Sequence, residues 1–322
     1  MILGEILKEI GKFSSRYKKA IFIIFIAWFF WAFGLGMLGG WFLAKGSLSK
    51  FPEIKTSDRI LILAPHIDDE IISSAGLIQE TKAVGAKILI VYATNGDDNP
   101  VSLISKDKTY KPSDFVILGE QRMNEGKKAL ALLGLDEKNY IFLGYPDQGL
   151  KSMLQNPTVP YTSRSTRFNY NPYKGTFREQ QPYTGENLES DLKTISLEFK
   201  PTIVILPHPR DNHSDHRSLF RFWEKVSSEN QLNSSQYAYL VHFRLYPPEK
   251  KLRENEFLYP PKKLFTQEGW YSFDLSTEQQ KNKLGAVSQN VSQLKMSSFD
   301  NFLRSFVRMN EIFEKIDSPS LF

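Results

Sequence analysis

The chain has 322 residues, of which 41% are hydrophobic and 24% are charged, with 19 Gly and 17 Pro. This ordinary globular mixture excludes collagen-like repeats, a disordered chain and a multi-span membrane protein. Because the chain has no cysteine, it has no disulfides and no thiol nucleophile, and any metal must be bound by histidine and carboxylate. The formal net charge of +5 is too small to indicate nucleic-acid binding.

Residues 20–44 contain no charged side chain. As a helix they would extend about 37 Å, more than the ~30 Å hydrocarbon core of a bilayer, so we expect a single transmembrane anchor. A buried core helix and a cleaved signal peptide are the alternatives, although a signal peptide has a shorter apolar region. The basic residues in the preceding tail, 1–19, predict a cytoplasmic N-terminus and an extracytoplasmic catalytic domain. Small residues at Ala32, Gly36 and Gly40 would allow two such helices to pair, so an oligomer is left open.

After a polar linker at residues 45–58, apolar strand patterns alternate with helical patterns. We expect strands at 59–64, 87–93, 140–143, 202–206 and 237–243, helices at 69–84, 113–133 and 215–227, and a mostly helical end at 276–316. The runs RILILA and TIVIL are continuously apolar, as in strands buried on both faces. The pattern predicts one α/β domain over residues 59–322, with a Rossmann-like, mainly parallel sheet and helices on both faces.

Residues 146–186 interrupt this alternation. They carry five prolines and six aromatic residues with no clear period, and loops of this length are uncommon unless they are functional or disordered. The aromatic side chains would suit a wall of the substrate site, since they can stack on sugar rings. A surface loop with its own small hydrophobic cluster is the alternative.

Four of the five histidines lie in two clusters, and each cluster directly follows a buried strand. The first is PHIDDE at residues 65–70, and the second is HPRDNHSDH at residues 208–216. The carboxyl ends of parallel strands are where ligands bind in open α/β sheets, so the two clusters can converge. Asp68 or Asp69 alone would be explained as a helix cap. Two clusters in matching positions instead predict a catalytic metal site made of histidine and aspartate.

The two clusters resemble the motifs of the PIG-L (LmbE-like) zinc-dependent N-acetylglucosaminyl deacetylases. That family carries Pro-His-Pro-Asp-Asp-Glu after its first strand, here with Ile67 in place of the second proline, and His-Pro-x-Asp-x-His-x-Asp-His later, which residues 208–216 match throughout. Weaker similarities, among them the Leu143–Asp147 turn, extend the resemblance over residues 57–313. The segment at 20–44 and the insert at 146–186 lie outside it.

The resemblance implies a role for each matching residue. His66, Asp69 and His216 would bind one Zn²⁺ per chain, Asp68 would be the general base, and His213 would stabilise the oxyanion or protonate the leaving amine. Asp211 and Asp215 would be carboxylates that hold the ligand rings. The chemistry agrees, because zinc polarises a carbonyl and activates water, and a neighbouring carboxylate can take the proton.

Other polar residues in or near these motifs have weaker expectations. Arg122 would bind a substrate phosphate or hydroxyl, or else pair with Glu125 three residues away. Asp147 would line the substrate site, or else belong to an ordinary turn. His208 and Glu70 would support the site without binding metal. His242 ends a predicted strand without a partner in sequence, and we expect a structural role for it.

The sequence thus predicts a membrane-anchored, zinc-dependent N-deacetylase acting on an N-acetylglucosamine-type sugar of a glycan or glycolipid. Its partners would be that sugar and the lipid bilayer, through residues 20–44, and not nucleic acid. A zinc amidase that deacylates a non-sugar amine remains open. So does a catalytically silent glycan-binding protein, although such a protein has no need of a general base.

Overall fold

The computed structural model describes residues 5, 22–24, 26–29, 31, 48–100, 102–103, 110–265 and 269–316. The chain divides into two compact units, Met1–Leu48 and Ser49–Phe322. The described residues of the first unit are helical, apart from Leu48 at its end. The second unit contains the sheet, its helices and both histidine clusters.

The first unit corrects the expected membrane localisation. Among the residues that the structure describes, no helix is long and apolar enough to cross a membrane. Within 20–44 the structure describes residues 22–24, 26–29 and 31. The rest of that segment, including Ala32, Gly36 and Gly40, lies outside the described residues, as does the tail 1–19 apart from Glu5.

The second unit is built on one eight-stranded sheet, with the order β1-β7-β8-β6-β5-β2-β3-β4. The strands are β1 (Ser49–Lys50), β2 (Arg59–Ala64), β3 (Lys87–Thr94), β4 (Tyr140–Tyr145), β5 (Ile203–Pro207), β6 (Ser235–Tyr239), β7 (Trp270–Asp274) and β8 (Asn310–Ile316). From β4 to β6 every neighbouring pair is parallel, and only β8 runs antiparallel to its neighbours β6 and β7. The expected mainly parallel sheet is confirmed.

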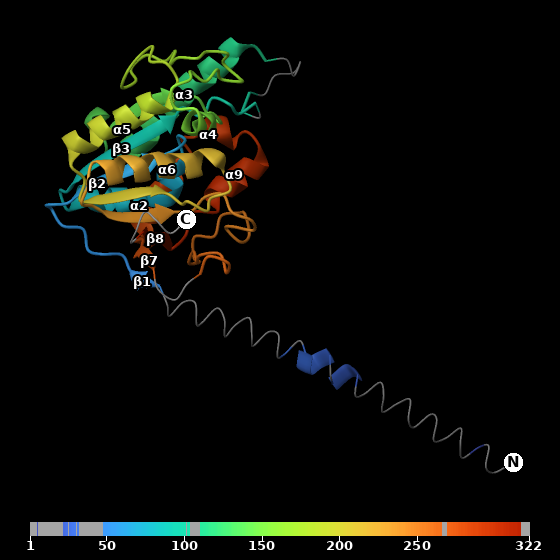
Figure 1. Ribbon diagram of the computed structural model, residues 1–322. Helices are drawn as coiled ribbons and strands as arrows, with labels where there is room; N and C mark the ends of the chain where they lie inside the picture. Colours follow the sequence, from blue (N-terminus) through green and yellow to red (C-terminus); the bar gives the residue numbers. More distant parts are fainter. Residues whose placement is uncertain are drawn as a thin grey trace. The chain divides into compact units, whose positions relative to one another are not determined.

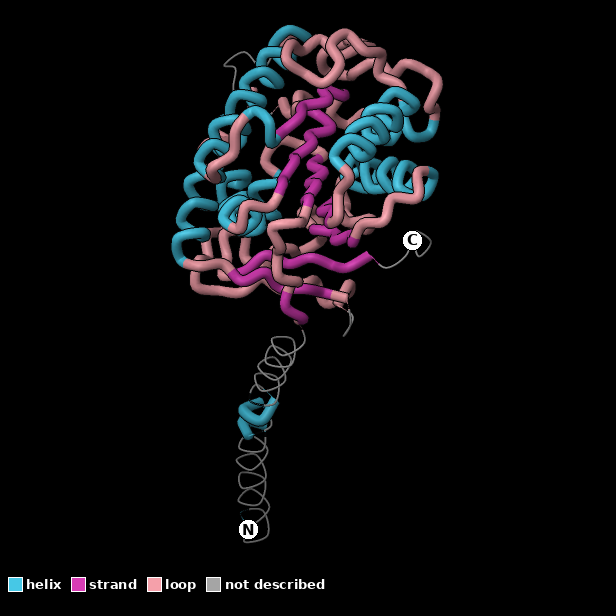
Figure 2. Tube along the Cα trace, turned by 90° about the vertical axis from the view of Figure 1, so that its left-hand side faces the viewer, coloured by secondary structure: helices cyan, strands magenta, loops and turns pink. Residues whose placement is uncertain are grey.

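Helices cover both faces of the sheet (Figures 1 and 2). They are α2 (Asp69–Ala83), α3 (Pro112–Leu132), α4 (Leu150–Gln155), α5 (Gly185–Phe199), α6 (Ser214–Glu229), α7 (Thr277–Val287), α8 (Val291–Leu294) and α9 (Ser297–Arg304), with a short 3₁₀ helix at Glu137–Asn139. On one face α7 packs against α2 and α3, and on the other α6 packs against α4 and α5.

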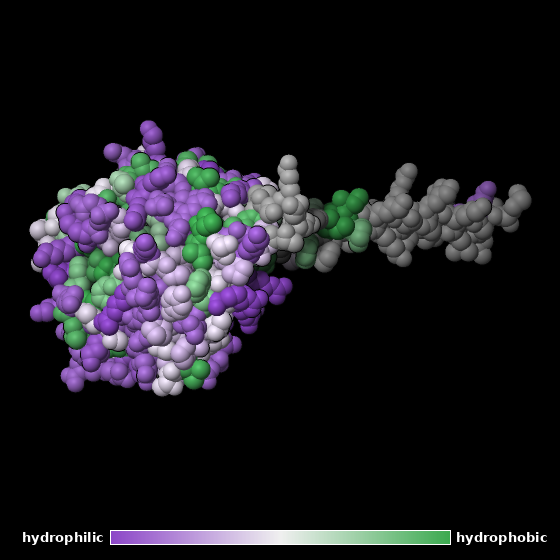
Figure 3. Space-filling model, turned by 90° about the horizontal axis from the view of Figure 1, so that it is seen from above, coloured by the Kyte–Doolittle hydropathy of each residue, from purple (hydrophilic) through white to green (hydrophobic). Residues whose placement is uncertain are grey.

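The core lies between the central strands and these helices. The side chains of β2 and β5 are almost completely buried, since these strands have neighbours on both edges and helices on both faces. Leu61, Leu63, Val204 and Leu206 belong to one hydrophobic cluster with Trp223 of α6. The surface seen in Figure 3 is mostly hydrophilic, with scattered apolar side chains, as is usual for a folded domain.

Two expected elements differ from the structure. The end at 276–316, expected to be mostly helical, contains three short helices followed by β8. Glu and Lys in β8 suit a helix, but β8 pairs with strands on both sides and buries Ile312 and Phe313, which outweighs local propensity. The expected strand at 237–243 ends at Tyr239, so Val241 and His242 leave the sheet at its carboxyl edge.

Candidate active site

The two histidine clusters meet because β2 and β5 are neighbours. These strands are far apart in sequence but pair in parallel, with Ile60 opposite Ile203. The loops that follow them therefore leave the sheet at the same edge. Chain order reverses between β2 and β5, which makes this edge the switch point at which open α/β sheets bind ligands.

His66, Asp69 and His216 form the centre of the site. Asp69 Oδ2 lies 3.3 Å from His66 Nδ1 and 3.2 Å from His216 Nε2. All three residues are buried, and His216 Nε2, which faces Asp69, has no hydrogen-bond partner among the described residues. Buried imidazole nitrogens gathered around a carboxylate are the donor set of a divalent metal site. Three overlapping groups among the described residues could hold a metal ion: His66 with His213 and His216, Asp69 with His216 and His242, and His66 with Asp147 and Asp215. The expectation of a His/Asp cluster able to bind a metal is confirmed at that level, and the choice of His66, Asp69 and His216 as its ligands stays a prediction.

Carboxylates lie against the opposite nitrogens of both rings. Asp211 Oδ2 is 3.3 Å from His216 Nδ1, and His66 Nε2 is 3.2 Å from Asp147 Oδ1 and 3.5 Å from Asp215 Oδ2. Such partners fix the tautomer and orientation of a ligating imidazole. Asp211 and Asp215 thus lie where the resemblance implies. Asp147, expected to contact substrate, faces His66 as well as the cavity.

The carboxylates make the centre attractive to a cation. Burial opposes the charged form of His216, but Asp211 and Asp69 outweigh it and raise the pKa of His216 to about 10. Burial likewise disfavours the charge of Asp69, but the two imidazoles hold its pKa well below the usual range. Positive charge is therefore stabilised here, and a metal ion would provide it.

Asp68 stands beside this centre in a conformation that few residues adopt. Its φ of 139° lies in the left-handed region, which is costly for a residue with a Cβ atom. Burial raises the pKa of the Asp68 carboxyl to about 7, with Arg122 opposing the shift and Asp69 adding to it. A carboxyl group with a pKa near neutrality suits a general base.

Arg122 holds Asp68 in place. Its Nη2 donates to Asp68 Oδ2 at 3.1 Å and to the Ile67 carbonyl oxygen at 2.6 Å, and its Nη1 donates to the Gly96 carbonyl oxygen at 3.0 Å. A Cβ atom at Gly96 would lie 2.1 Å from Arg122 Nη1, so this close packing requires glycine. The alternative pairing with Glu125 does not form, because that carboxylate accepts hydrogen bonds from Ser292.

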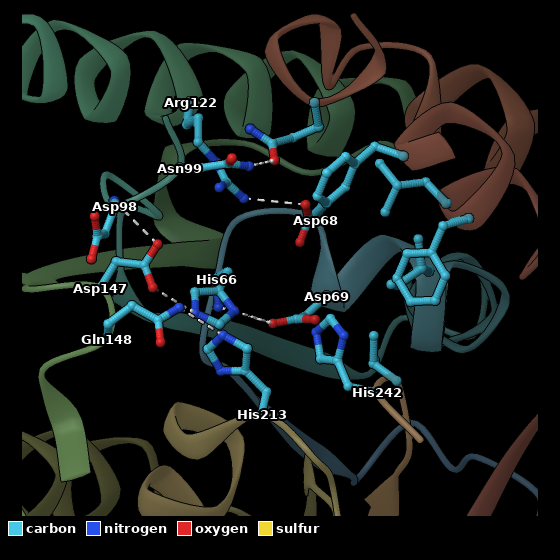
Figure 4. Close-up of a pocket in the computed structure, with 16 residues that line it drawn as sticks. His66, Asp68, Asp69, Asp98, Asn99, Arg122, Asp147, Gln148, His213 and His242 are labelled. Carbon is cyan, nitrogen blue, oxygen red and sulfur yellow. Dashed lines mark hydrogen bonds and ion pairs between the residues drawn. The ribbon is translucent and has the colours of Figure 1, made fainter. Parts of the chain in front are cut away.

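His213 lies on the far side of the centre from Asp68, as Figure 4 shows. Its Nδ1 accepts the Asp215 backbone N–H at 3.2 Å, so the hydrogen of the neutral ring is on Nε2. Nε2 lies 2.9 Å from the side-chain amide of Gln148, which accepts this hydrogen when its oxygen rather than its nitrogen faces the ring. Burial, together with the positive His66 and His216, lowers the pKa of His213 to about 2. The ring is therefore a neutral hydrogen-bond donor at the cavity.

His208 and Glu70 lie outside the cavity wall. His208 Nε2 is 2.5 Å from Glu314 Oε2 of β8, and its ring stacks on Trp270, so it ties the second motif to the sheet. Glu70 Oε2 accepts the Asp68 backbone N–H at 3.1 Å, and burial raises the Glu70 pKa to about 8. Both placements agree with supporting rather than ligating roles.

A cavity of about 350 Å³ opens above these residues, and Figure 4 shows its lining. One part of the wall is polar and the other is apolar. The lining side chains are His66, Asp68, Asp69, Ile72, Asp98, Asn99, Arg122, Asp147, Gln148, His213, Val241, His242, Gln293, Phe299, Phe302 and Leu303. The polar part suits sugar hydroxyls, since it offers amides and carboxylates.

His242, expected to be structural, is a wall residue of this cavity. Its ring centre is 4.9 Å from that of His216, and with Asp69 and His216 it forms a second group able to hold a metal. The missed signal was its position just beyond a strand, as in the two motifs. Gln293 belongs to one of the weaker similarities to the family, whereas Gln148 and the α9 phenylalanines carried no sequence signal, because they reach the site from separate elements.

A family model described as PIG-L, GlcNAc-PI de-N-acetylase, matches residues 61–227. The chain belongs to the PIG-L family. The predicted resemblance is thereby confirmed, and with it the expectation of an enzyme of the metal-dependent N-deacetylase class. A search of curated proteins finds no match.

Three solved structures share the PIG-L fold seen here. The N,N'-diacetylchitobiose deacetylase from Pyrococcus horikoshii is 19% identical, with a TM-score of 0.52 and coverage of 81% of this chain and 84% of that one. An A40926 pseudoaglycone deacetylase is 15% identical, with a TM-score of 0.52 and coverage of 82% and 99%. A conserved protein from Thermus thermophilus is 18% identical, with a TM-score of 0.50 and coverage of 82% and 97%.

Proposed function

We propose that this PIG-L protein removes the N-acetyl group from an N-acetylglucosamine-type sugar. The observation that carries the proposal is the placement of Asp68 and His213 on opposite sides of the buried His66–Asp69–His216 centre, at the floor of one cavity. The family description and the chitobiose deacetylase of the same fold support a sugar substrate. We assign the catalytic domain to residues 59–322, with 146–186 as an insert. The preceding segment 45–58, expected as a linker, adds the edge strand β1 to the sheet of this domain.

The three central residues would hold one Zn²⁺. The ion would supply the Lewis acidity that amide hydrolysis needs. Asp211, Asp215 and Asp147 would keep the two imidazole rings oriented toward it by accepting from their far nitrogens.

The chain's own residues would then move the protons. Asp68 takes a proton from the attacking water, while Arg122 keeps its carboxylate in position. The water oxygen bonds to the amide carbon, and the Nε2 hydrogen of His213 faces the developing negative charge or the leaving nitrogen. As the C–N bond breaks, the leaving nitrogen takes the proton that Asp68 received from the water, directly or through His213. The free amine and acetic acid, which ionises to acetate, are released and Asp68 is again ionised.

The proposal is tested by measuring acetate release from zinc-loaded full-length protein. The substrates should include N-acetylglucosamine, N,N'-diacetylchitobiose, N-acetylglucosamine 1-phosphate and acetylated non-sugar amines. We expect release from the sugars, its loss on adding a chelator and its return with Zn²⁺. Release from the non-sugar amines alone would replace the sugar deacetylase with an amidase. Zinc binding without hydrolysis of any substrate would indicate a silent binding protein.

A further inference from the structure

His242 is a histidine of the cavity wall that the proposed reaction does not use. It lies just beyond β6, and Figure 4 shows its ring beside the Asp69 carboxylate. A ring nitrogen of His242 lies within 4.8 Å of a carboxylate oxygen of Asp69 and of a ring nitrogen of His216. Two ligands on opposite sides of a zinc ion lie about 4.2 Å apart, since each bond is about 2.1 Å long. Ligand atoms at this spacing can therefore reach a common ion.

The backbone of His242 is fixed by the second histidine cluster, residues 208–216. Its N–H donates to Asp211 Oδ2 at 2.9 Å, and its carbonyl oxygen accepts the Asn212 N–H at 2.6 Å. Asp211 Oδ2 also lies 3.3 Å from His216 Nδ1. The same carboxylate thus holds the His216 ring and the backbone that carries His242, which is how outer contacts orient the ligands of a metal.

The ring of His242 is held by packing, while its nitrogens are left to other partners. Phe302 of α9 stacks on the ring with 5.6 Å between ring centres and 22° between ring planes. Within the part of the chain that the structure describes, no hydrogen bond is made by either ring nitrogen of His242. A half-buried imidazole in this position is available to an ion without giving up a bond to the protein.

His213 is the other imidazole near the centre, and its nitrogens already have polar neighbours. Its Nδ1 accepts the Asp215 N–H at the start of α6, and its Nε2 faces the side-chain amide of Gln148. A bond from His213 to the ion would have to replace one of these contacts. This difference favours His242 as the additional ligand.

We propose that His242 is a fourth protein ligand of the metal ion, beside His66, Asp69 and His216. The ion would then be bound by three imidazoles and one carboxylate, one of them from outside the two histidine clusters. Zinc at a catalytic centre accepts five ligands, so a position for water remains. The inference rests on the proposed function, which places the ion at this centre.

The first test is the zinc dissociation constant of the full-length protein, measured by competition with a chromophoric chelator. His242→Gln should raise the constant at least about 100-fold, because one ligand bond is lost. His213→Gln is the matched control, since it removes another imidazole from the same cavity wall, and it should change the constant less than about threefold. Circular dichroism verifies that both variants are folded.

The second test uses the absence of cysteine from the chain. A thiolate bound to Co²⁺ gives a sulfur-to-cobalt charge-transfer absorption in the near ultraviolet, and in His242→Cys only residue 242 can be its source. We expect this absorption in His242→Cys loaded with Co²⁺. His213→Cys loaded with the same ion should lack it.

The outcomes separate this inference from the proposed function. An unchanged zinc dissociation constant in His242→Gln would overturn the fourth ligand, as would a larger loss of affinity in His213→Gln. Absence of the charge-transfer absorption in a folded His242→Cys that binds Co²⁺ would also overturn it. Neither readout needs turnover, so zinc binding that depends on His242, without acetate release from any substrate, would overturn the proposed function alone.

Discussion

At the scale of single residues, Asp68 combines three features that are energetically unfavourable for an ionised aspartate. Its backbone is in a rarely populated region, its carboxyl group is buried, and it neighbours the negative Asp69. Arg122 offsets part of this cost by donating to Asp68 Oδ2. Buried carboxyl groups on a strained backbone are common in active sites. Their shifted pKa and the fixed orientation of their side chain both serve the reaction.

Replacing Asp68 with asparagine should remove the general base and leave the metal centre intact. We expect kcat to fall about 10²–10⁴-fold, with one zinc per chain retained, because Asp68 bonds to Arg122 rather than to His66 or His216. Acetate release and metal analysis measure the two effects. Asp136→Asn, at an exposed turn, is the control, and full activity in Asp68→Asn would exclude the base role.

Asp211 should determine how tightly the metal is held. It faces His216 Nδ1 and also accepts the backbone N–H groups of Val241 and His242. Asp211→Asn weakens this support, so we expect the zinc dissociation constant to rise about 10–100-fold. Competition with a chromophoric chelator measures this without reference to activity. An unchanged constant in a folded variant would show that Asp211 does not orient the ring.

The central residues could be predicted from sequence because they lie in two short motifs after buried strands. His66, Asp69 and His216 needed only the pairing of β2 with β5 to meet. The contact of Asp147 with His66, and of Arg122 with Asp68, could not be predicted in this way. Each of these two contacts joins elements that are distant in the sequence. Which polar groups a side chain reaches then depends on how those elements pack in the folded protein.

At the scale of elements, the insert at 146–186 is tied to the site by a buried tyrosine. Tyr173 is 1% exposed, and its hydroxyl donates to Asp97 Oδ2 at 2.5 Å. Asp97 Oδ1 accepts the backbone N–H of Asp147, the residue that faces His66. A Cβ atom at Gly119 of α3 would lie 2.5 Å from the Tyr173 hydroxyl, so the ring occupies a close-fitting space.

Tyr173→Phe should destabilise the protein by about 1–3 kcal/mol, because a buried acceptor loses its donor. Burial, with a smaller contribution from Asp147, raises the pKa of Asp97 from 3.8 to about 7. The folded state thus binds this proton more tightly than the unfolded state, and the contribution of Asp97 to stability declines as pH rises from about 4 to 7.

The tyrosine hydroxyl stabilises the charged form of Asp97, so its loss should cost more at pH 8 than at pH 5. Urea unfolding at both values measures the difference. Tyr170→Phe, an exposed ring in the same insert, is the control. An equal cost at the two pH values would contradict the coupling.

A second element, α2, depends on the C-terminal strand. The helix departs from helical geometry at Ser74, and Glu311 of β8 accepts the N–H groups of Gly76 and Leu77 just beyond. Glu311 also bonds to buried Lys283 at 2.8 Å. Glu311→Gln would leave that ammonium without its counter-charge, and we expect a loss of about 3–5 kcal/mol.

The double variant Glu311→Gln with Lys283→Met should be more stable than Glu311→Gln alone, since the uncompensated charge is then absent. Denaturant unfolding of the two single variants and the double variant completes the cycle. Additive losses would show that the pair does not act as a unit.

At the scale of the whole molecule, the parallel strands from β4 to β6 in the sheet order followed from their apolar runs, but β7 and β8 did not. The sequences of β7 and β8 are mixed in polarity, and half-buried residues give them no continuous apolar signal. The pairing of β8 with β6 and β7 depends on contacts between residues that are far apart in the sequence. The expected membrane localisation was wrong, since no helix of the described residues is long and apolar enough to cross a membrane.

The unit Ser49–Phe322 should fold without residues 1–48. It contains the complete sheet and every residue of the proposed site. A protein beginning at Ser49 should therefore keep the thermal unfolding temperature of its catalytic unit and its zinc affinity. Calorimetry and chelator competition test this against the full chain, and a loss of zinc binding would show that the first unit contributes to the site.

The position of β8 has a consequence for synthesis of the protein. The last strand of the described chain lies between β6 and β7 rather than at an edge. A nascent chain therefore exposes one unpaired edge on each of two strands until β8 has left the ribosome, and α2 lacks Glu311 until then. Premature termination before residue 310 should yield an aggregating chain and not a smaller enzyme, because an open strand edge promotes pairing with other chains.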